Sequence, residues 1–206
     1  MQAYKVAAQN CESEFTEKKS RFISYLKCVT TEQEAREFIE SVRQSHRDAT
    51  HNCFAYRLFD PRVERFSDDG EPSGTAGMPM LEVMKKEDIY NVCVVVTRYF
   101  GGILLGGGGL IRAYSRGVSD ALEKSGSATR LPSVTLRVTF GYDGYSRVEK
   151  LLENVTHKKL DCVFGEKVSL TLSIIEAERD KIVSELTDAL CGALELCELS
   201  RGSDSF

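Results

Sequence analysis

The sequence lacks the features that mark several large classes of protein. No apolar stretch approaches the roughly 20 residues that a transmembrane helix needs, and residues 1–5 lack the apolar segment of a signal peptide. The seven cysteines are odd in number and scattered, with no C-x-x-C pair. These absences argue against membrane insertion, a disulfide framework and a zinc site. They predict reduced thiols in a cytoplasmic protein without a membrane partner.

An overall basic charge is missing too. The chain carries 27 basic and 31 acidic residues, for a net charge of −4. Residues 1–130 hold 18 of each sign, whereas residues 131–206 hold 9 basic and 13 acidic groups. A general attraction to nucleic acid is therefore not expected, and any polyanion site must be a local patch on the first part.

The second part has the pattern of a small α+β domain. Small and polar residues at 125–132 end in Pro132 and predict a boundary, so we expect domains at 1–130 and 131–206. Alternating apolar residues predict strands at 134–140, 160–164, 168–174 and 194–199. Helices are expected after Asp143, as a capping residue, and around 182–190. This β-α-β-β-α-β order is that of a ferredoxin-like domain.

The first part is also expected to be α+β. Thr31 and Glu34 form a capping-box pattern before a helix with one apolar face. Strands are expected around 14–15, 22–29 and 52–59, and a short helix at 75–84. The β-branched run at 91–97 is typical of a strand in the middle of a sheet.

A glycine-dense turn follows that central strand. Residues 98–109 read RYFGGILLGGGG, and the six glycines of the turn are Gly101, Gly102, Gly106, Gly107, Gly108 and Gly109. Tight packing of a helix on a sheet and anion binding at a helix N-terminus both explain such a turn. The turn lacks the G-K-[ST] ending of a P-loop, so the sequence does not support nucleotide hydrolysis. Arg98, Arg112 and Arg116 flank the turn; they could hold phosphates bidentately or pair with a nearby acidic loop.

That acidic loop contains Asp68, Asp69 and Glu71. Three carboxylates could hold Mg²⁺ or supply a general base, or they could cap the next helix and neutralise the arginines. A hydrolase would combine His51 with Ser73 or Cys53 as the nucleophile and Asp68 or Asp69 as the orienting group, although structural roles explain these residues equally well. Some aromatic residues could stack on bases or belong to the core: Tyr56, Tyr99, Phe100 and Tyr114.

Three segments resemble the YigZ/IMPACT family in their residues and in their order along the chain: 45–56, 66–79 and 98–109. The resemblance covers residues 19–114. It implies a first domain similar in fold to a ribosomal-protein and elongation-factor domain, and a second resembling a terminal domain of elongation factor G. Eukaryotic members restrain a stress-activated kinase and carry an extra N-terminal domain, for which we expect no room before the first motif here. For bacterial members the resemblance implies a link to translation or nucleic acid.

The predicted function is therefore non-catalytic binding of structured RNA or a ribosome-associated surface, linked to regulation of translation. The groove is expected where the three segments converge. There, Arg98, Arg112 and Arg116 would contact phosphate, the N–H groups of Gly106 to Gly109 would assist, and Tyr99 or Phe100 would pack on the ligand. The acidic second part would orient the complex or bind a protein partner. No cofactor or metal is expected.

Two other classes stay open. One is an enzyme that acts on a small phosphorylated or peptide substrate, with four candidate catalytic residues: His51, Asp68, Asp69 and Glu71. It predicts a concave pocket, whereas a nucleic-acid module predicts an open basic stripe. The other is a protein-interaction module without a small ligand.

Overall fold

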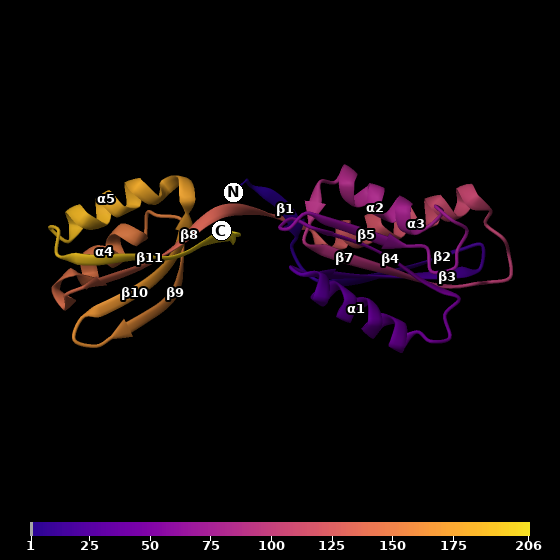
Figure 1. The fold of residues 1–206 in the computed structure, drawn as a ribbon, viewed down its shortest axis with the longest axis horizontal. Helices are drawn as coiled ribbons and strands as arrows, with labels where there is room; N and C mark the ends of the chain where they lie inside the picture. The colour runs from indigo at the N-terminus through magenta and orange to yellow at the C-terminus, as the bar shows by residue number, and fades with distance from the viewer. Residues whose placement is uncertain (1) are drawn as a thin grey trace. The chain divides into compact units, whose positions relative to one another are not determined.

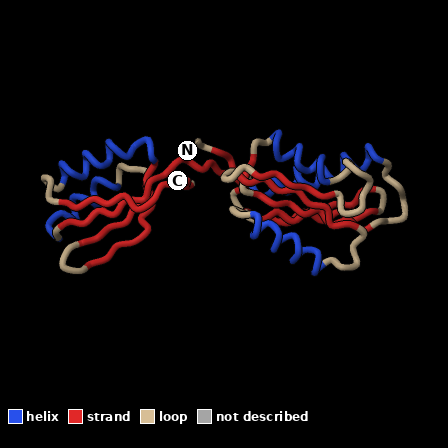
Figure 2. Tube along the Cα trace, viewed as in Figure 1, coloured by secondary structure: helices blue, strands red, loops and turns tan. Residues whose placement is uncertain are grey.

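The computed structural model describes residues 2–206. The chain divides into two compact units: the first is Tyr4–Ala128, and the second is Thr129–Phe206 together with residues 2–3 (Figure 1). Strand β8 (Ser127–Phe140) carries the chain from the first unit into the second. In each unit helices pack on a β-sheet, which confirms the predicted α+β class (Figure 2). No helix within residues 2–206 is both long and apolar enough to cross a membrane.

The first unit is built on a five-stranded sheet in which every pair of neighbours is antiparallel. Its order is β2 (Cys11–Glu17), β3 (Ser20–Cys28), β7 (Val92–Tyr99), β4 (His51–Leu58) and β5 (Val63–Ser67). The β-branched run forms the central strand β7, as predicted. Val94 and Val96 belong to the core on one face, and Val95 belongs to the core on the other. Burial on both faces explains why this strand is apolar throughout.

Helices cover both faces of this sheet. Helix α1 (Glu32–Ser45) lies on one face, and α2 (Gly77–Lys86) and α3 (Gly107–Ser125) lie on the other (Figure 1). The predicted cap of α1 is present, because the Thr31 hydroxyl accepts a hydrogen bond from the Glu34 amide at 3.1 Å. The Glu34 carboxylate accepts a hydrogen bond from the Thr30 amide at 2.6 Å and also interacts with the Thr31 amide, as in a capping box.

Three strands of the first unit were not predicted. They are β1 (Tyr4–Ala7), β6 (Ile89–Tyr90) and β5. Strand β1 pairs in parallel with β6, which has only two residues and gives no periodic signal. Strand β5 reads Val-Glu-Arg-Phe-Ser and lies at the edge of its sheet, where little of it is buried.

The second unit confirms the ferredoxin-like prediction. Its order is β8, α4 (Tyr145–Leu152), β9 (His157–Phe164), β10 (Val168–Ile175), α5 (Arg179–Ala189) and β11 (Leu194–Asp204), with one-turn 3₁₀ helices η1 (Tyr142–Gly144) and η2 (Glu176–Glu178) before the two α-helices. The sheet runs β11-β8-β10-β9 and is antiparallel, as a split β-α-β pair requires. The two helices and the sheet share an apolar core that includes Leu172 and Leu186.

The predicted cap of α4 is wrong. Gly144 occupies the N-cap position and makes no side-chain capping bond. Asp143 lies one residue earlier, in η1, and its carboxylate pairs with Arg147 at 3.3 Å. The extra 3₁₀ turn moves the helix start beyond the aspartate, which the apolar spacing alone could not show.

Candidate functional site

All three of the sequence segments meet at one pocket of about 360 Å³ in the first unit. The first segment contributes Thr50 and His51 at the start of β4, and the second contributes residues 70–72 of the loop before α2. The third contributes Arg98, Phe100 and the turn that leads into α3. The remaining lining is apolar and comes mainly from Leu104, Leu105 and Leu110.

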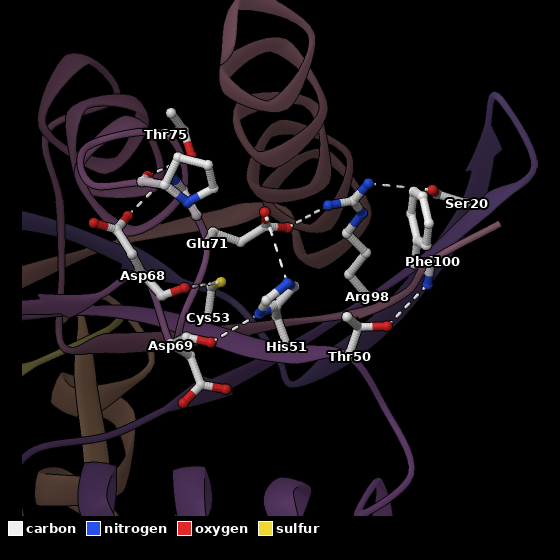
Figure 3. A network of polar contacts seen from close by, with 12 residues as sticks. Ser20, Thr50, His51, Cys53, Asp68, Asp69, Glu71, Thr75, Arg98 and Phe100 are labelled. Atoms are coloured by element: carbon white, nitrogen blue, oxygen red, sulfur yellow. Dashed lines mark hydrogen bonds and ion pairs between the residues drawn. The ribbon is translucent and has the colours of Figure 1, made fainter. Parts of the chain in front are cut away.

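A buried ion pair forms part of the pocket wall. Arg98 Nη1 lies 2.6 Å from Glu71 Oε1, and the two side chains are only 6% and 3% exposed (Figure 3). The Tyr114 hydroxyl, on α3, donates to the same carboxylate oxygen at 2.8 Å. Arg98 Nη2 donates to the Ser20 hydroxyl at 3.3 Å, while the buried Arg98 Nε has no hydrogen-bond partner. The charges are thus neutralised inside the protein, and the Nε–H group of the guanidinium stays unused.

His51 is held beside this pair in one tautomer. Its Nδ1 lies 2.8 Å from the backbone oxygen of Asp69. Because a carbonyl oxygen can only accept, Nδ1 carries a proton. The opposite nitrogen, Nε2, lies 3.8 Å from Glu71 Oε2 (Figure 3). His51 is therefore oriented with Nδ1 towards the Asp69 carbonyl and Nε2 towards the Glu71 carboxylate.

The glycine turn ends in a helix N-terminus without a cap. The N-cap residue Gly106 has φ of +72° and no side-chain capping bond. The first hydrogen bond of α3 joins the Leu110 amide to the Gly106 oxygen at 2.9 Å. The amides of Gly107, Gly108 and Gly109 thus have no acceptor within the helix. Such amides, together with the helix dipole, favour an anion.

Packing explains only some of the glycines. A Cβ on Gly101 would lie 2.0 Å from the backbone of Lys19, and Gly102 has φ of +83°. Gly109 would bring a Cβ to within 3.0 Å of Leu105 Cβ. A Cβ on Gly107 or Gly108 would meet nothing closer than 3.9 Å or 3.7 Å, respectively. Neither packing nor backbone conformation requires glycine at these two exposed positions, and the space around both is open.

The carboxylates of the acidic loop do not converge. Asp68 binds the amides of Gly74, Ala76 and Gly77 at 2.9, 3.0 and 2.8 Å, and so caps the start of α2. Asp69 binds Arg43 at 2.9 Å and the Asn52 amide at 2.7 Å.

Because Asp68, Asp69 and Glu71 point to separate partners, they offer no shared Mg²⁺ site (Figure 3). No group of three potential metal ligands occurs within residues 2–206. Of the four candidate catalytic residues, His51 and Glu71 line the pocket, whereas Asp68 and Asp69 are not among its lining residues.

The three arginines do not share one groove, contrary to the expected arrangement. Arg98 is buried in its ion pair, while Arg112 and Arg116 are exposed on α3 and line a second pocket together with Lys18. Arg116 also pairs with Asp120 at 3.2 Å. The four-residue spacing correctly placed the two helix arginines on one face, but it could not show that Arg98 is enclosed by the acidic loop.

Tyr99 does not line the pocket. Successive strand residues point to opposite faces of a sheet, and the Tyr99 hydroxyl contacts His46 Nδ1 at 2.8 Å at the end of α1. Phe100, the other aromatic candidate, does line the pocket and is 45% exposed.

Neither proposed nucleophile is suited to that role. Cys53 is fully buried in the core, its thiol lies 2.9 Å from the Asp68 backbone oxygen, and burial raises its pKa to about 12. Ser73 is exposed and does not line the pocket. Tyr114, a candidate for base stacking, is fully buried, and burial raises the pKa of its hydroxyl.

Several residues that line the pocket were not predicted from the sequence: Thr50, Pro72, Leu104, Leu105 and Leu110. Leu104 could have been suspected, because an apolar residue between two groups of glycines has no helix or strand of its own in which to pack. It is 80% exposed at the edge of the pocket.

The sequence comparisons agree with the three segments. Residues 18–122 match the model of the Impact N-terminal domain. An IMPACT family member of Bacillus subtilis, YvyE, is 39% identical over 199 residues, which cover 96% of this chain and 92% of that protein. The chain is a member of the IMPACT family.

Other members of the IMPACT family are similar over different lengths. YigZ of Escherichia coli is 37% identical over 87% of this chain and 89% of its own length. Protein IMPACT of Homo sapiens is 34% identical over 44% of this chain and 30% of its own length.

Residues 138–193, in the second unit, match a domain of unknown function, DUF1949. A crystal structure described as that of a hypothetical protein is 34% identical, covers 97% of this chain and 98% of its own, and superposes with a TM-score of 0.64. The similarity to this structure therefore extends over both units.

Proposed function

We propose that the first unit is a non-catalytic RNA-binding module that acts in translation, in the cytoplasm, on the ribosome or on structured RNA. The observation that carries the proposal is the uncapped N-terminus of α3, whose first three amides have no acceptor within the helix. Gly107 of this helix start lines the pocket, and Gly109 lines the second one. Free amides at a helix N-terminus are a common phosphate site in proteins. Membership of the IMPACT family supports a role in translation. The scattered cysteines, with no C-x-x-C pair, support a location in the cytoplasm.

The exposed basic residues next to this helix start support an extended ligand. Lys18, Arg112 and Arg116 line the second pocket, which shares Leu105 with the first. A strand whose phosphate lies at the α3 N-terminus could continue along these cations. Exposed cations are screened by salt, so the proposal requires salt-dependent binding.

The test is fluorescence anisotropy of a labelled single-stranded RNA across a salt series. A Lys18/Arg112/Arg116→Ala variant should bind at least tenfold more weakly at low salt, with a shallower dependence of affinity on salt. The control replaces Lys27, Arg36 and Arg47, three basic residues outside both pockets, by alanine. Arg98 is left intact because its loss would leave Glu71 buried without its partner. Equal affinity of both variants would contradict the proposal.

A second candidate, an enzyme acting on a small phosphorylated or peptide substrate, is favoured by the fixed orientation of His51 towards Glu71. Its test is the release of phosphate or cleaved peptide from a panel of such compounds. Turnover that disappears in His51→Gln, while RNA affinity is retained, would establish the enzyme. Absence of turnover from the whole panel would leave His51 a binding residue.

For the second unit we propose a role in orienting the complex through a basic protein partner, because residues 131–206 hold 13 acidic and 9 basic groups. Reversing three exposed charges, in Glu153→Lys, Glu178→Lys and Asp188→Lys together, should weaken co-sedimentation with purified ribosomes without changing the affinity for RNA. Unchanged co-sedimentation would contradict this role.

A further inference from the structure

We propose that the pocket of His51, Glu71 and Arg98 binds a nucleoside phosphomonoester, either a free nucleotide or the phosphorylated end of an RNA strand. The inference rests on the proposed RNA-binding function and makes it more specific. It assigns to the pocket the end of the strand, with the phosphate at the N-terminus of α3 and the base against the apolar wall.

The size of the pocket limits the ligand. At about 360 Å³ it lies at the lower end of the roughly 300–1,000 Å³ that small-molecule pockets span. Such a volume holds one nucleotide-sized body and not several bases side by side. A strand that passed through would need a longer groove, so the pocket fits a terminal unit.

The wall of the pocket selects the body of the ligand. Pro72, Phe100, Leu104, Leu105 and Leu110 present apolar surface with few polar groups between them. A sugar phosphate would leave several hydroxyl groups without hydrogen-bond partners there, and a buried polar group without a partner is unfavourable. A planar base instead covers apolar surface. Phe100 and Leu104, at 45% and 80% exposed, are the side chains that a base would cover.

The polar end of the pocket selects a terminal phosphate. Gly107 lines the pocket, and its N–H group is followed in the same helical turn by those of Gly108 and Gly109, so three donors lie at this helix end. Gly107 and Gly108 are exposed and have no side chain to keep a ligand away. A phosphomonoester offers three terminal oxygens, whereas a phosphodiester inside a strand offers two. Arg98, whose Nε has no partner, lines the same pocket and already neutralises Glu71, so the carboxylate does not repel the ligand.

The experiment compares four forms of one RNA decamer by anisotropy: 5′-phosphorylated, 3′-phosphorylated, with hydroxyl groups at both ends, and circular. We expect at least one phosphorylated form to bind tenfold or more tightly than the hydroxyl and circular forms. Adenosine monophosphate should displace it. If the mononucleotide binds as tightly as the phosphorylated RNA, the ligand is a free nucleotide. If the mononucleotide binds much more weakly than the phosphorylated RNA, the ligand is the RNA end.

Two variants test whether the phosphorylated RNA binds at the pocket and the adjoining start of α3. Leu104→Ser removes an exposed side chain and should lower affinity for the phosphorylated form several-fold, whereas Leu160→Ser, at a 53% exposed position of the second unit, should not. Gly108→Glu puts a carboxylate at the helix start and should abolish the preference for a phosphorylated end. Both substitutions are at exposed positions, so the fold should be retained.

Equal binding of circular and phosphorylated RNA would overturn the end-binding inference and leave the RNA-binding function intact. If neither RNA nor adenosine monophosphate binds, both the end-binding inference and the RNA-binding function are overturned. If adenosine monophosphate binds and no RNA does, the nucleotide site is retained and the RNA-binding function is overturned. Binding of a peptide with an apolar C-terminal residue, in place of every phosphorylated probe, would reassign the pocket to a carboxylate.

Discussion

The two units of this protein differ in what they bury. In the first, Arg57, Glu71 and Arg98 are each less than a tenth exposed. In the second, the buried polar residues are uncharged: Ser133, Thr171 and Ser173. Enclosing an ion pair costs desolvation that its attraction often only offsets. A pair kept at the wall of a pocket is therefore better explained by that pocket than by stability, and the second unit shows that this chain builds an adequate core without buried charge.

The largest expected effect comes from breaking the buried pair. Glu71→Ala leaves Arg98 charged and enclosed, and should lower the free energy of unfolding of the first unit by about 3–5 kcal/mol. Urea unfolding followed by residue-resolved NMR would show the first unit melting earlier. The matched change, Glu198→Ala, removes the partner of Arg179 and Arg201 at a 28% exposed side chain of the second unit. It should cost less than about 1 kcal/mol. Equal losses in the two units would contradict the comparison.

Alkaline pH should also separate the units. Burial raises the pKa of Cys53 from 9.0 to about 12. The thiol therefore stays protonated in the folded state while its unfolded counterpart ionises. The resulting stability is complete below pH 9 and is lost as the pH rises towards 12, by an amount on the order of 4 kcal/mol. Cys53→Ala should flatten this pH dependence in thermal unfolding curves of the first unit. An unchanged slope would show that Cys53 ionises normally in the folded protein.

Asp68 should behave as a structural residue. Asp68→Ala removes three backbone hydrogen bonds at the start of α2 and should cost about 2 kcal/mol. Asp161→Ala in the second unit loses only a contact to the next amide, of Cys162, and should cost less than about 0.5 kcal/mol. Adding MgCl₂ should shift the melting temperature of neither the parent protein nor the variants. A rise seen only with Asp68 intact would restore the metal hypothesis.

The smallest effect on stability is expected at the glycine turn. Gly107→Ala adds a methyl group to a helical position with open space around it, and should raise stability by at most about 1 kcal/mol. It should nevertheless lower affinity for phosphorylated RNA, because the methyl group stands where the ligand approaches. Gly101→Ala is the contrasting variant, since its Cβ would collide with the Lys19 backbone and destabilise the first unit. Higher stability with unchanged affinity at Gly107 would separate the turn from ligand binding.

The success of the sequence predictions differs with the range of the interactions involved. Local patterns were sufficient for the apolar strand β7, for the helix that begins after Thr31 and for the ferredoxin-like order of the second unit. Each of these follows from periodicity or capping within a few residues. Strand β6, with two residues that pair with β1 more than 80 positions away, has no such local signal.

The candidate site was only partly predictable for the same reason. The three segments named most of its polar residues, but the partner of each charge depended on tertiary contacts. Glu71 and Arg98 are 27 positions apart, and Asp68 turns instead to the backbone of α2. Strand alternation alone could have placed Tyr99 on the face opposite Arg98. Apart from Leu104, the apolar wall of the pocket could not be predicted, because Leu105 and Leu110 look like ordinary core residues.

The most direct test of the phosphate site is a ¹⁵N–¹H NMR titration of the full chain with the 5′- and 3′-phosphorylated RNA decamers. The account predicts that the amide signals of Gly107, Gly108 and Gly109 shift progressively with at least one of them, along with that of Phe100, while those of the second unit's core strands stay in place. Shifts confined to other residues, or none at saturating RNA, would contradict a phosphate site at the N-terminus of α3.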